Sequence, residues 1–286
     1  MPVTVLSVYA ALAIWAILLV RGIRSHSYRP FLLFGIGLMV ILNIGYFING
    51  VPASIASFIG IYDVLINIGL AQDTSAAAIS RCAENACTVW GDQFVNHPAW
   101  GAAFYDRFAN GPEFRSTLLY GHIGFNSVAF VLMHVQLFRP GFGENRTQHR
   151  LVGRIAFASL TLSVICAVWL ASQHGPVTEY GGALSEYGFY SMAAFVYACA
   201  VMGIVKARAG DMEAHRVWMF RFMGSMWGSF WLFRVMLFVI DPLFRNYEAV
   251  AILTCIWASA PLGILMGELI RRRLDGLGVR SPAAVA

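Results

Sequence analysis

The sequence predicts an all-α fold: a polytopic integral membrane protein with seven transmembrane helices. Of its 286 residues, 58% are hydrophobic and 12% are charged, whereas a soluble globular domain carries about 25% charged residues. The apolar residues form long runs, and the basic residues collect between alternate runs. This composition excludes a soluble enzyme, and the many Phe, Trp and aliphatic side chains exclude a disordered chain.

Seven apolar stretches are long enough to cross a bilayer, because about 20 helical residues span about 30 Å of hydrocarbon. The first stretch has no basic segment before it and no small-residue cleavage site after it, which favours a retained anchor over a cleaved signal peptide. The sixth contains Arg221 and Arg234, and the other six contain no charged residue. In order, the stretches are Val3–Val20, Phe31–Gly50, Ser116–Phe138, Ile155–Gln173, Tyr187–Val205, Val217–Ile240 and Ala249–Gly267.

The distribution of arginine predicts the orientation. Basic residues are concentrated between stretches one and two, three and four, and five and six, and again after stretch seven. Because basic loops stay in the cytoplasm, the N-terminus is expected outside and the C-terminus inside a bacterial inner membrane. The apolar segment Ala53–Leu70 has Asp63 in its middle, and as an eighth crossing it would reverse every later loop. We expect it to form an interfacial helix.

Four regions follow from this order. Residues 1–50 hold two N-terminal transmembrane helices, and residues 51–115 form an outer, periplasmic segment that includes the interfacial helix. Residues 116–240 form a four-helix core that contains the histidines and arginines of interest, and residues 241–286 form the last helix and a basic cytoplasmic tail. We expect one structural domain, because no linker or internal repeat separates these regions.

The five cysteines divide between the membrane and the outer segment. Cys82 and Cys87 fall on the outer side, where disulfides persist in bacteria, and a local disulfide between them is expected. A metal-binding pair is the alternative. Cys166, Cys199 and Cys255 lie within apolar stretches, where a small packing residue is expected.

Four histidines lie at the ends of predicted spans and are candidate cofactor ligands. His122 and His174 lie toward the outer face, and His149 and His215 toward the inner face. Neutral imidazole is an axial ligand of haem iron. A pair from neighbouring helices at each face would therefore hold two b-type haems and carry electrons across the membrane. The same residues could hold zinc, copper or iron without porphyrin, or serve only as interfacial hydrogen-bonding groups.

Two arginines within the sixth stretch are further candidates, because a charge in hydrocarbon costs at least about 2.5–3.5 kcal/mol. Arg234 lies six residues, or about 9 Å, from the outer end of the stretch. It could anchor a haem propionate, a quinone head group or a substrate carboxylate, or reach the surface by snorkelling. Arg221 lies near the inner face, where a lipid phosphate or Glu268 could pair with it.

The sixth stretch also carries Met219, Met223 and Met226 on one helix face. Thioether sulfur is a ligand for Cu(I), but a methionine stripe at helical spacing is more often part of a packed core. Trp227 and Trp231 in the same stretch indicate tight aromatic packing, around one another or around a flat ligand.

Two short motifs carry a resemblance to a known family. Residues 149–154 match a His-Arg-x-x-Gly-Arg pattern, and residues 214–221 match an Ala-His-Arg-x-Trp-Met-x-Arg pattern. With His122 before them and Arg234 after them, they resemble the predicted bacterial membrane-protein family labelled domain of unknown function 2306, over roughly Arg115 to Ile240. The resemblance implies a four-helix membrane core whose expected set of residues is His122, His149, His215, Arg221 and Arg234. It implies no particular activity.

The function expected from these features is that of a membrane protein with a histidine-lined core that binds haem b or a transition metal ion. Such a core indicates transmembrane or quinone-linked electron transfer, and hence a membrane oxidoreductase. One alternative is a non-redox transporter or the membrane subunit of a larger complex. Another is a nonhaem metal-dependent membrane enzyme. The expected partners are the lipid bilayer and a quinone or another redox partner, and nucleic acid is not expected.

Overall fold

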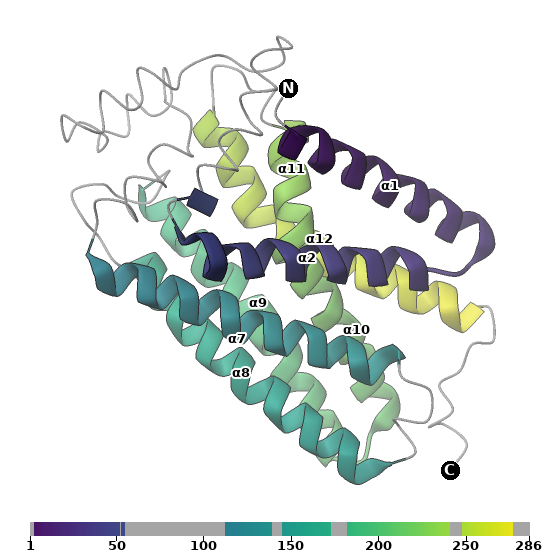
Figure 1. Ribbon diagram of the computed structural model, residues 1–286. Helices are drawn as coiled ribbons and strands as arrows, with labels where there is room; N and C mark the ends of the chain where they lie inside the picture. The colour runs from purple at the N-terminus through teal and green to yellow at the C-terminus, as the bar shows by residue number, and fades with distance from the viewer. Residues whose placement is uncertain are drawn as a thin grey trace, which may run out of the picture.

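A computed structural model describes residues 3–51, 53–54, 112–138, 145–172, 182–240 and 248–276, and across these ranges the chain is helical and contains no strand. The expected interfacial helix, apart from its first two residues, lies outside the described residues, as do Cys82, Cys87 and His174. The elements (Figure 1) are α1 (Val3–Ser25), α2 (Arg29–Asn49), α7 (Glu113–Phe138), α8 (Arg146–Ser172), α9 (Gly182–Arg208), α10 (Met212–Trp227), the π-helical turn η1 (Gly228–Leu232), α11 (Phe233–Ile240) and α12 (Glu248–Gly276).

Five of these helices are long and apolar enough to cross a membrane, which confirms the prediction of an all-α, multi-pass membrane protein. They are α2, α7, α8, α9 and α12. The predicted sixth stretch corresponds to α10, η1 and α11, which follow one another without a break from Met212 to Ile240. Cys199 and Cys255 are buried, as expected of packing residues, and Cys166 is half-buried.

Several helices extend beyond the predicted apolar stretches at one end. α8 begins at Arg146 rather than Ile155, and α12 continues past Gly267 to Gly276. Hydropathy detects only the part of a helix that lies in hydrocarbon, and polar side chains continue the helix into the interface. At the start of α8, the side-chain oxygen of Asn145 accepts a hydrogen bond from the backbone N–H three residues on, at 3.1 Å. At the start of α10, the carboxylate of Asp211 does the same at 3.0 Å. Such N-caps place the first turn before the apolar run.

An aromatic cluster centred on Trp227, which is 1% exposed, joins α1, α2, α7 and α10. Its ring stacks with Phe31 and Trp15 at centroid distances of 5.7 and 5.9 Å. The Trp231 indole N–H donates to the Gly35 carbonyl at 3.1 Å, and the Trp227 indole N–H donates to His134 Nε2 at 2.8 Å. A buried donor needs a partner where water is absent, so these tryptophans fix how α10 and η1 meet α2 and α7.

The methionines of the sixth stretch belong to the same core. Met223 and Met226 are 2% and 3% exposed within this cluster, and Met219 packs against it. Their packing role is therefore confirmed.

Glycines make a close backbone contact between α12 and the run of α10 and η1. Gly224 and Gly228 face Gly263 and Gly267, four residues apart on each helix. A Cβ atom on Gly263 would overlap the carbonyl oxygen of Gly224, and one on Gly228 would overlap the carbonyl oxygen of Ser259. Small residues at this spacing let two membrane helices pack backbone against backbone. We call these four glycines the glycine clamp.

Replacement of Gly263 by Ala is expected to lower the free energy of unfolding by about 1–3 kcal/mol, because the added methyl group meets backbone that cannot rotate away. Thermal unfolding of the detergent-solubilised protein measures this as a lower midpoint. Gly37→Ala in α2 is the matched control, since a Cβ there meets nothing within 4 Å. It should leave the midpoint unchanged or raise it, and an equal loss in both variants would contradict the clamp.

Candidate functional site

The structure brings His149 and His215 together at one end of the bundle. Each lies in the first turn of its helix, four residues after the N-cap, and their backbone N–H groups donate to the Asn145 and Asp211 carbonyls at 3.0 and 2.9 Å. The two imidazole centroids are 6.3 Å apart, with planes at 85°. The pair predicted for the inner face therefore forms a contact between α8 and α10.

The ring of His215 is oriented by α9. Its Nδ1 lies 2.8 Å from the carbonyl oxygen of Gly203. A carbonyl only accepts hydrogen bonds, so Nδ1 carries the proton and Nε2 of the neutral ring keeps its lone pair. Metal-ligating histidines commonly use their second nitrogen in this way. A Cβ at position 203 would overlap the Met219 methyl group, so the glycine leaves room for Met219.

His149 is positioned by α7 through the backbone. The Gln136 side-chain N–H donates to the His149 carbonyl at 3.2 Å. A Cβ on Gly153 would lie 3.2 Å from the same Gln136 nitrogen, so the glycine leaves room for it. The first motif therefore has a structural explanation: its histidine and its glycine, one turn apart on α8, both meet Gln136.

The arginines of the second motif join α10 to α12. Arg216 pairs with Asp275 at 2.6 Å, and Arg221 Nε lies 3.6 Å from a Glu268 oxygen. The Arg221 guanidinium also stacks over the Trp218 ring at 4.7 Å. Glu268 was named from sequence as a partner of Arg221, and that pairing is confirmed. Both contacts of the Arg221 guanidinium are made to other residues of the protein. The role expected for Arg221 toward a cofactor stays a prediction.

Glu268 is the centre of an ion-pair network at this end of α12. It accepts hydrogen bonds from Arg271 at 2.7 Å and from Arg272 at 2.9 Å, in addition to the pairing with Arg221. Its side chain is only 12% exposed. Arg273 of the same helix end lies 3.1 Å from His26, in the turn between α1 and α2. The ion pairs of Glu268 therefore tie α10 to α12, and the separate Arg273–His26 contact joins α12 to the α1–α2 turn.

A second polar cluster lies toward the opposite helix ends and includes His122 and Arg234. The His122 Nδ1 is 3.1 Å from the Ser163 carbonyl oxygen of α8. Arg234 donates to the Phe230 carbonyl at 2.6 Å, and its guanidinium lies 4.0 Å from the centroid of the Phe230 ring. Tyr46 of α2 packs in one buried cluster with Ile123, the residue after His122, and the charge of Arg234 acts on both Tyr46 and His122. We call Tyr46, His122, Ser163 and Arg234 the outer cluster.

Sequence reasoning missed several residues that the structure makes important. His134 is a core residue: its Nδ1 donates to the Phe130 carbonyl at 2.7 Å and its Nε2 accepts from Trp227. Gln136, Tyr46 and the glycine clamp were not selected either. The Gly-x-x-x-Gly spacing in residues 224–228 and 263–267 was a usable signal, whereas nothing in the sequence marked Tyr46 or Gln136.

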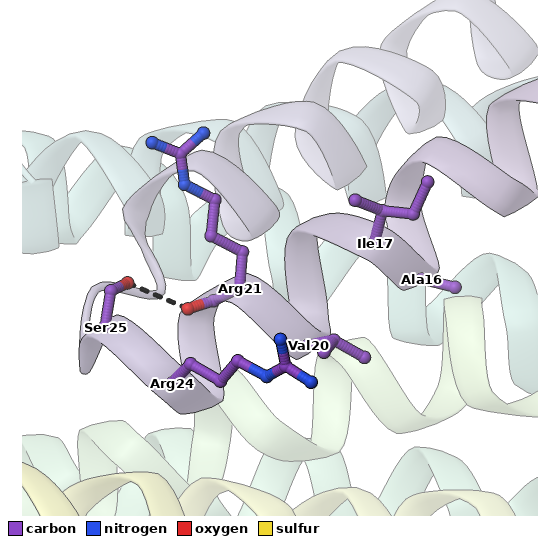
Figure 2. A pocket seen from close by; sticks show the side chains of 6 residues that line it. All are labelled: Ala16, Ile17, Val20, Arg21, Arg24 and Ser25. Carbon is purple, nitrogen blue, oxygen red and sulfur yellow. Dashed lines mark hydrogen bonds between the residues drawn. The ribbon is translucent and has the colours of Figure 1, made fainter.

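Within the described residues, no group of three or more His, Cys, Asp or Glu side chains is placed to hold a metal ion. A metal bound by His149 and His215 would complete its coordination with water, a porphyrin or an added ligand. A shallow open groove at the end of α1 is unrelated to these residues (Figure 2). It is lined by Ala16, Ile17, Val20, Arg21, Arg24 and Ser25, and its Ile17 is 66% exposed, as expected of a surface that faces lipid.

The helices and their charges define a multi-pass integral membrane protein with a histidine- and arginine-containing polar region at each end of its bundle. The chain belongs to the family of predicted membrane proteins DUF2306, whose model matches residues 119–268, just over half of the chain. The match runs beyond the resemblance expected from the motifs and includes most of α12 up to Glu268. No match was found among curated proteins or among solved structures.

Replacement of Glu268 by Gln is expected to lower the free energy of unfolding by about 1–3 kcal/mol, because charged donors at the membrane interface lose their common acceptor. Thermal unfolding in detergent provides the measurement. Glu113→Gln, in the exposed first turn of α7, is the control and should have no effect. Equal midpoints for the wild type and Glu268→Gln would show that the network does not stabilise the fold.

Proposed function

We propose that the protein is a seven-span inner-membrane protein that binds a metal centre through His149 and His215 and works in transmembrane or quinone-linked electron transfer. The observation that carries the proposal is the spacing of the two rings. An imidazole nitrogen bonds a metal at about 2.0–2.1 Å, so two rings facing one ion have centroids about 5–6.5 Å apart. The centroids of His149 and His215 are 6.3 Å apart.

The chemistry of the pair supports the same conclusion. His215 presents the Nε2 lone pair, because its Nδ1 is committed to the Gly203 carbonyl. Haem iron, zinc, copper and nonhaem iron all accept imidazole nitrogen. A porphyrin needs a slot between α8 and α10, whereas a single ion needs only the space between the rings. The expected outer pair of His122 and His174 stays a prediction, since His174 lies outside the described residues.

Contacts between helix ends support the expected orientation. His26 meets Arg273, Arg216 meets Asp275, and His149 meets His215. The basic loops between stretches one and two, three and four, and five and six, together with the end of α12, therefore gather at one end of the bundle. The positive-inside rule makes that end cytoplasmic and the N-terminus external. With this orientation, the proposed metal site lies at the cytoplasmic lip of the membrane.

The test is an optical spectrum and metal analysis of the purified, detergent-solubilised protein. We expect about one metal per chain, with a Soret band if the centre is haem. His149→Asn and His215→Asn should each lower the metal content at least about tenfold. Asparagine keeps a donor near the Nδ1 position but removes Nε2, so a loss reports on ligation and not on the Gly203 hydrogen bond.

His26→Asn is the matched control, because His26 lies at the same end of the bundle and is exposed. It should leave the metal content unchanged. A colourless wild type free of iron, copper and zinc would overturn the proposal and favour the transporter or subunit alternative. Full metal content in both pair variants would overturn the assignment of the ligands.

A further inference from the structure

The outer cluster gathers polar groups from four helices at a depth where lipid is expected. Tyr46 comes from α2, His122 from α7, Ser163 from α8 and Arg234 from α11. Tyr46 is 7% exposed and Ser163 is 1% exposed. Polar groups at this depth usually mark a functional site, because a purely structural role seldom offsets their cost of insertion. The proposed metal site uses none of them.

His122 supplies a hydrogen-bond acceptor. Its Nδ1 lies 3.1 Å from the Ser163 carbonyl and 3.0 Å from the Ser163 hydroxyl, which itself donates to the His122 carbonyl at 3.1 Å. The proton must therefore lie on Nδ1, since the carbonyl can only accept. Nε2 of the neutral ring is left with a lone pair.

Arg234 supplies donors. It follows directly after η1, where the Phe233 N–H reaches back five residues to the Gly228 carbonyl. Such π-turns are often found at functional sites. One of the five N–H groups of the Arg234 guanidinium donates a hydrogen bond to the Phe230 carbonyl. None of the ion pairs between the described residues includes Arg234.

This combination of a donor, an acceptor and the Tyr46 hydroxyl selects among ligands. A carboxylate or phosphate has only acceptor oxygens and would be repelled by the His122 lone pair. A quinone carbonyl accepts from Arg234, and the O–H of its reduced form donates to His122 Nε2. On α2, Phe47 and Ile48 beside Tyr46 are 53% and 75% exposed, as expected of a face that meets lipid. The outer cluster thus adjoins a lipid-facing part of α2, which favours a lipid-soluble ligand.

We infer that the outer cluster binds the head group of a lipid-soluble quinone in its reduced form, with Arg234 donating to one ring oxygen and the O–H of the other ring oxygen donating to His122 Nε2. This assigns the His122 nitrogen to the quinone and not to an outer haem. The inference rests on the quinone-linked part of the proposed function and names its binding site. It concerns binding only, so it can be tested separately from the metal site.

The test is isothermal titration of the full chain in lipid nanodiscs with two quinone probes, a short-chain benzoquinone and a short-chain naphthoquinone, each in its reduced form. We expect saturable binding of at least one probe. Arg234→Gln and His122→Asn should each weaken it at least about tenfold, and Tyr46→Phe should weaken it less. Arg24→Gln, at the exposed end of α1, is the control and should bind as the wild type does.

Three results would overturn the inference: no quinone binding by the wild type, equal binding by the wild type, Arg234→Gln and His122→Asn, or a site that takes benzoate but neither quinone. Loss of a haem spectrum in His122→Asn would also overturn it. Quinone binding that persists in His149→Asn and His215→Asn supports the inference even where the metal proposal fails. Tyr46→Phe, which keeps the aromatic ring, reports on the site should the charged variants fail to fold.

Discussion

The glycine clamp is the constraint on which the rest of the structure depends. Hydrocarbon gives membrane helices no hydrophobic reason to associate, so close packing and hydrogen bonds must hold them together. Gly224 and Gly228 let α10 and η1 approach the backbone of α12 at Gly263 and Gly267. That approach brings Arg216 and Arg221 within reach of Asp275 and Glu268. These ion pairs then stabilise the contact between α10 and α12 at the end of the bundle that meets water.

One helical run carries residues of both polar regions. His215 lies in its first turn, where α9 orients the ring and α8 supplies the facing His149. Arg234 lies beyond the π-turn, where the register of the helix has shifted by one residue. Trp227, between them, is locked by its stacking in the aromatic cluster and by its hydrogen bond to His134. The two polar regions are therefore held at fixed positions on a single rigid element.

The fold could be predicted from sequence because the bilayer permits few solutions: long apolar runs must be helices, and their charges must lie at the ends. His149 and His215 could be selected because both lie at span ends on the same predicted face, where a pair of imidazoles could share a ligand. The same rule could not predict where α8 begins or where α12 ends, because polar helix ends carry no hydropathy signal. The roles of Tyr46 and Gln136 could not be predicted for a different reason. Their roles depend on which helices are neighbours, and hydropathy does not encode neighbours.

The central claim is that the packed helices hold the imidazole rings of His149 and His215 with their centroids 6.3 Å apart. The most direct measurement is cross-linking of a His149→Cys, His215→Cys double variant in membranes with a short bifunctional thiol reagent, read as a linked peptide pair by mass spectrometry. We expect the pair to link in high yield. A control variant with cysteines at 149 and 122 should not link, because Ser163, which His122 contacts, lies about 21 Å along α8 from position 149. A folded protein that links neither pair, or links both equally, would contradict the account.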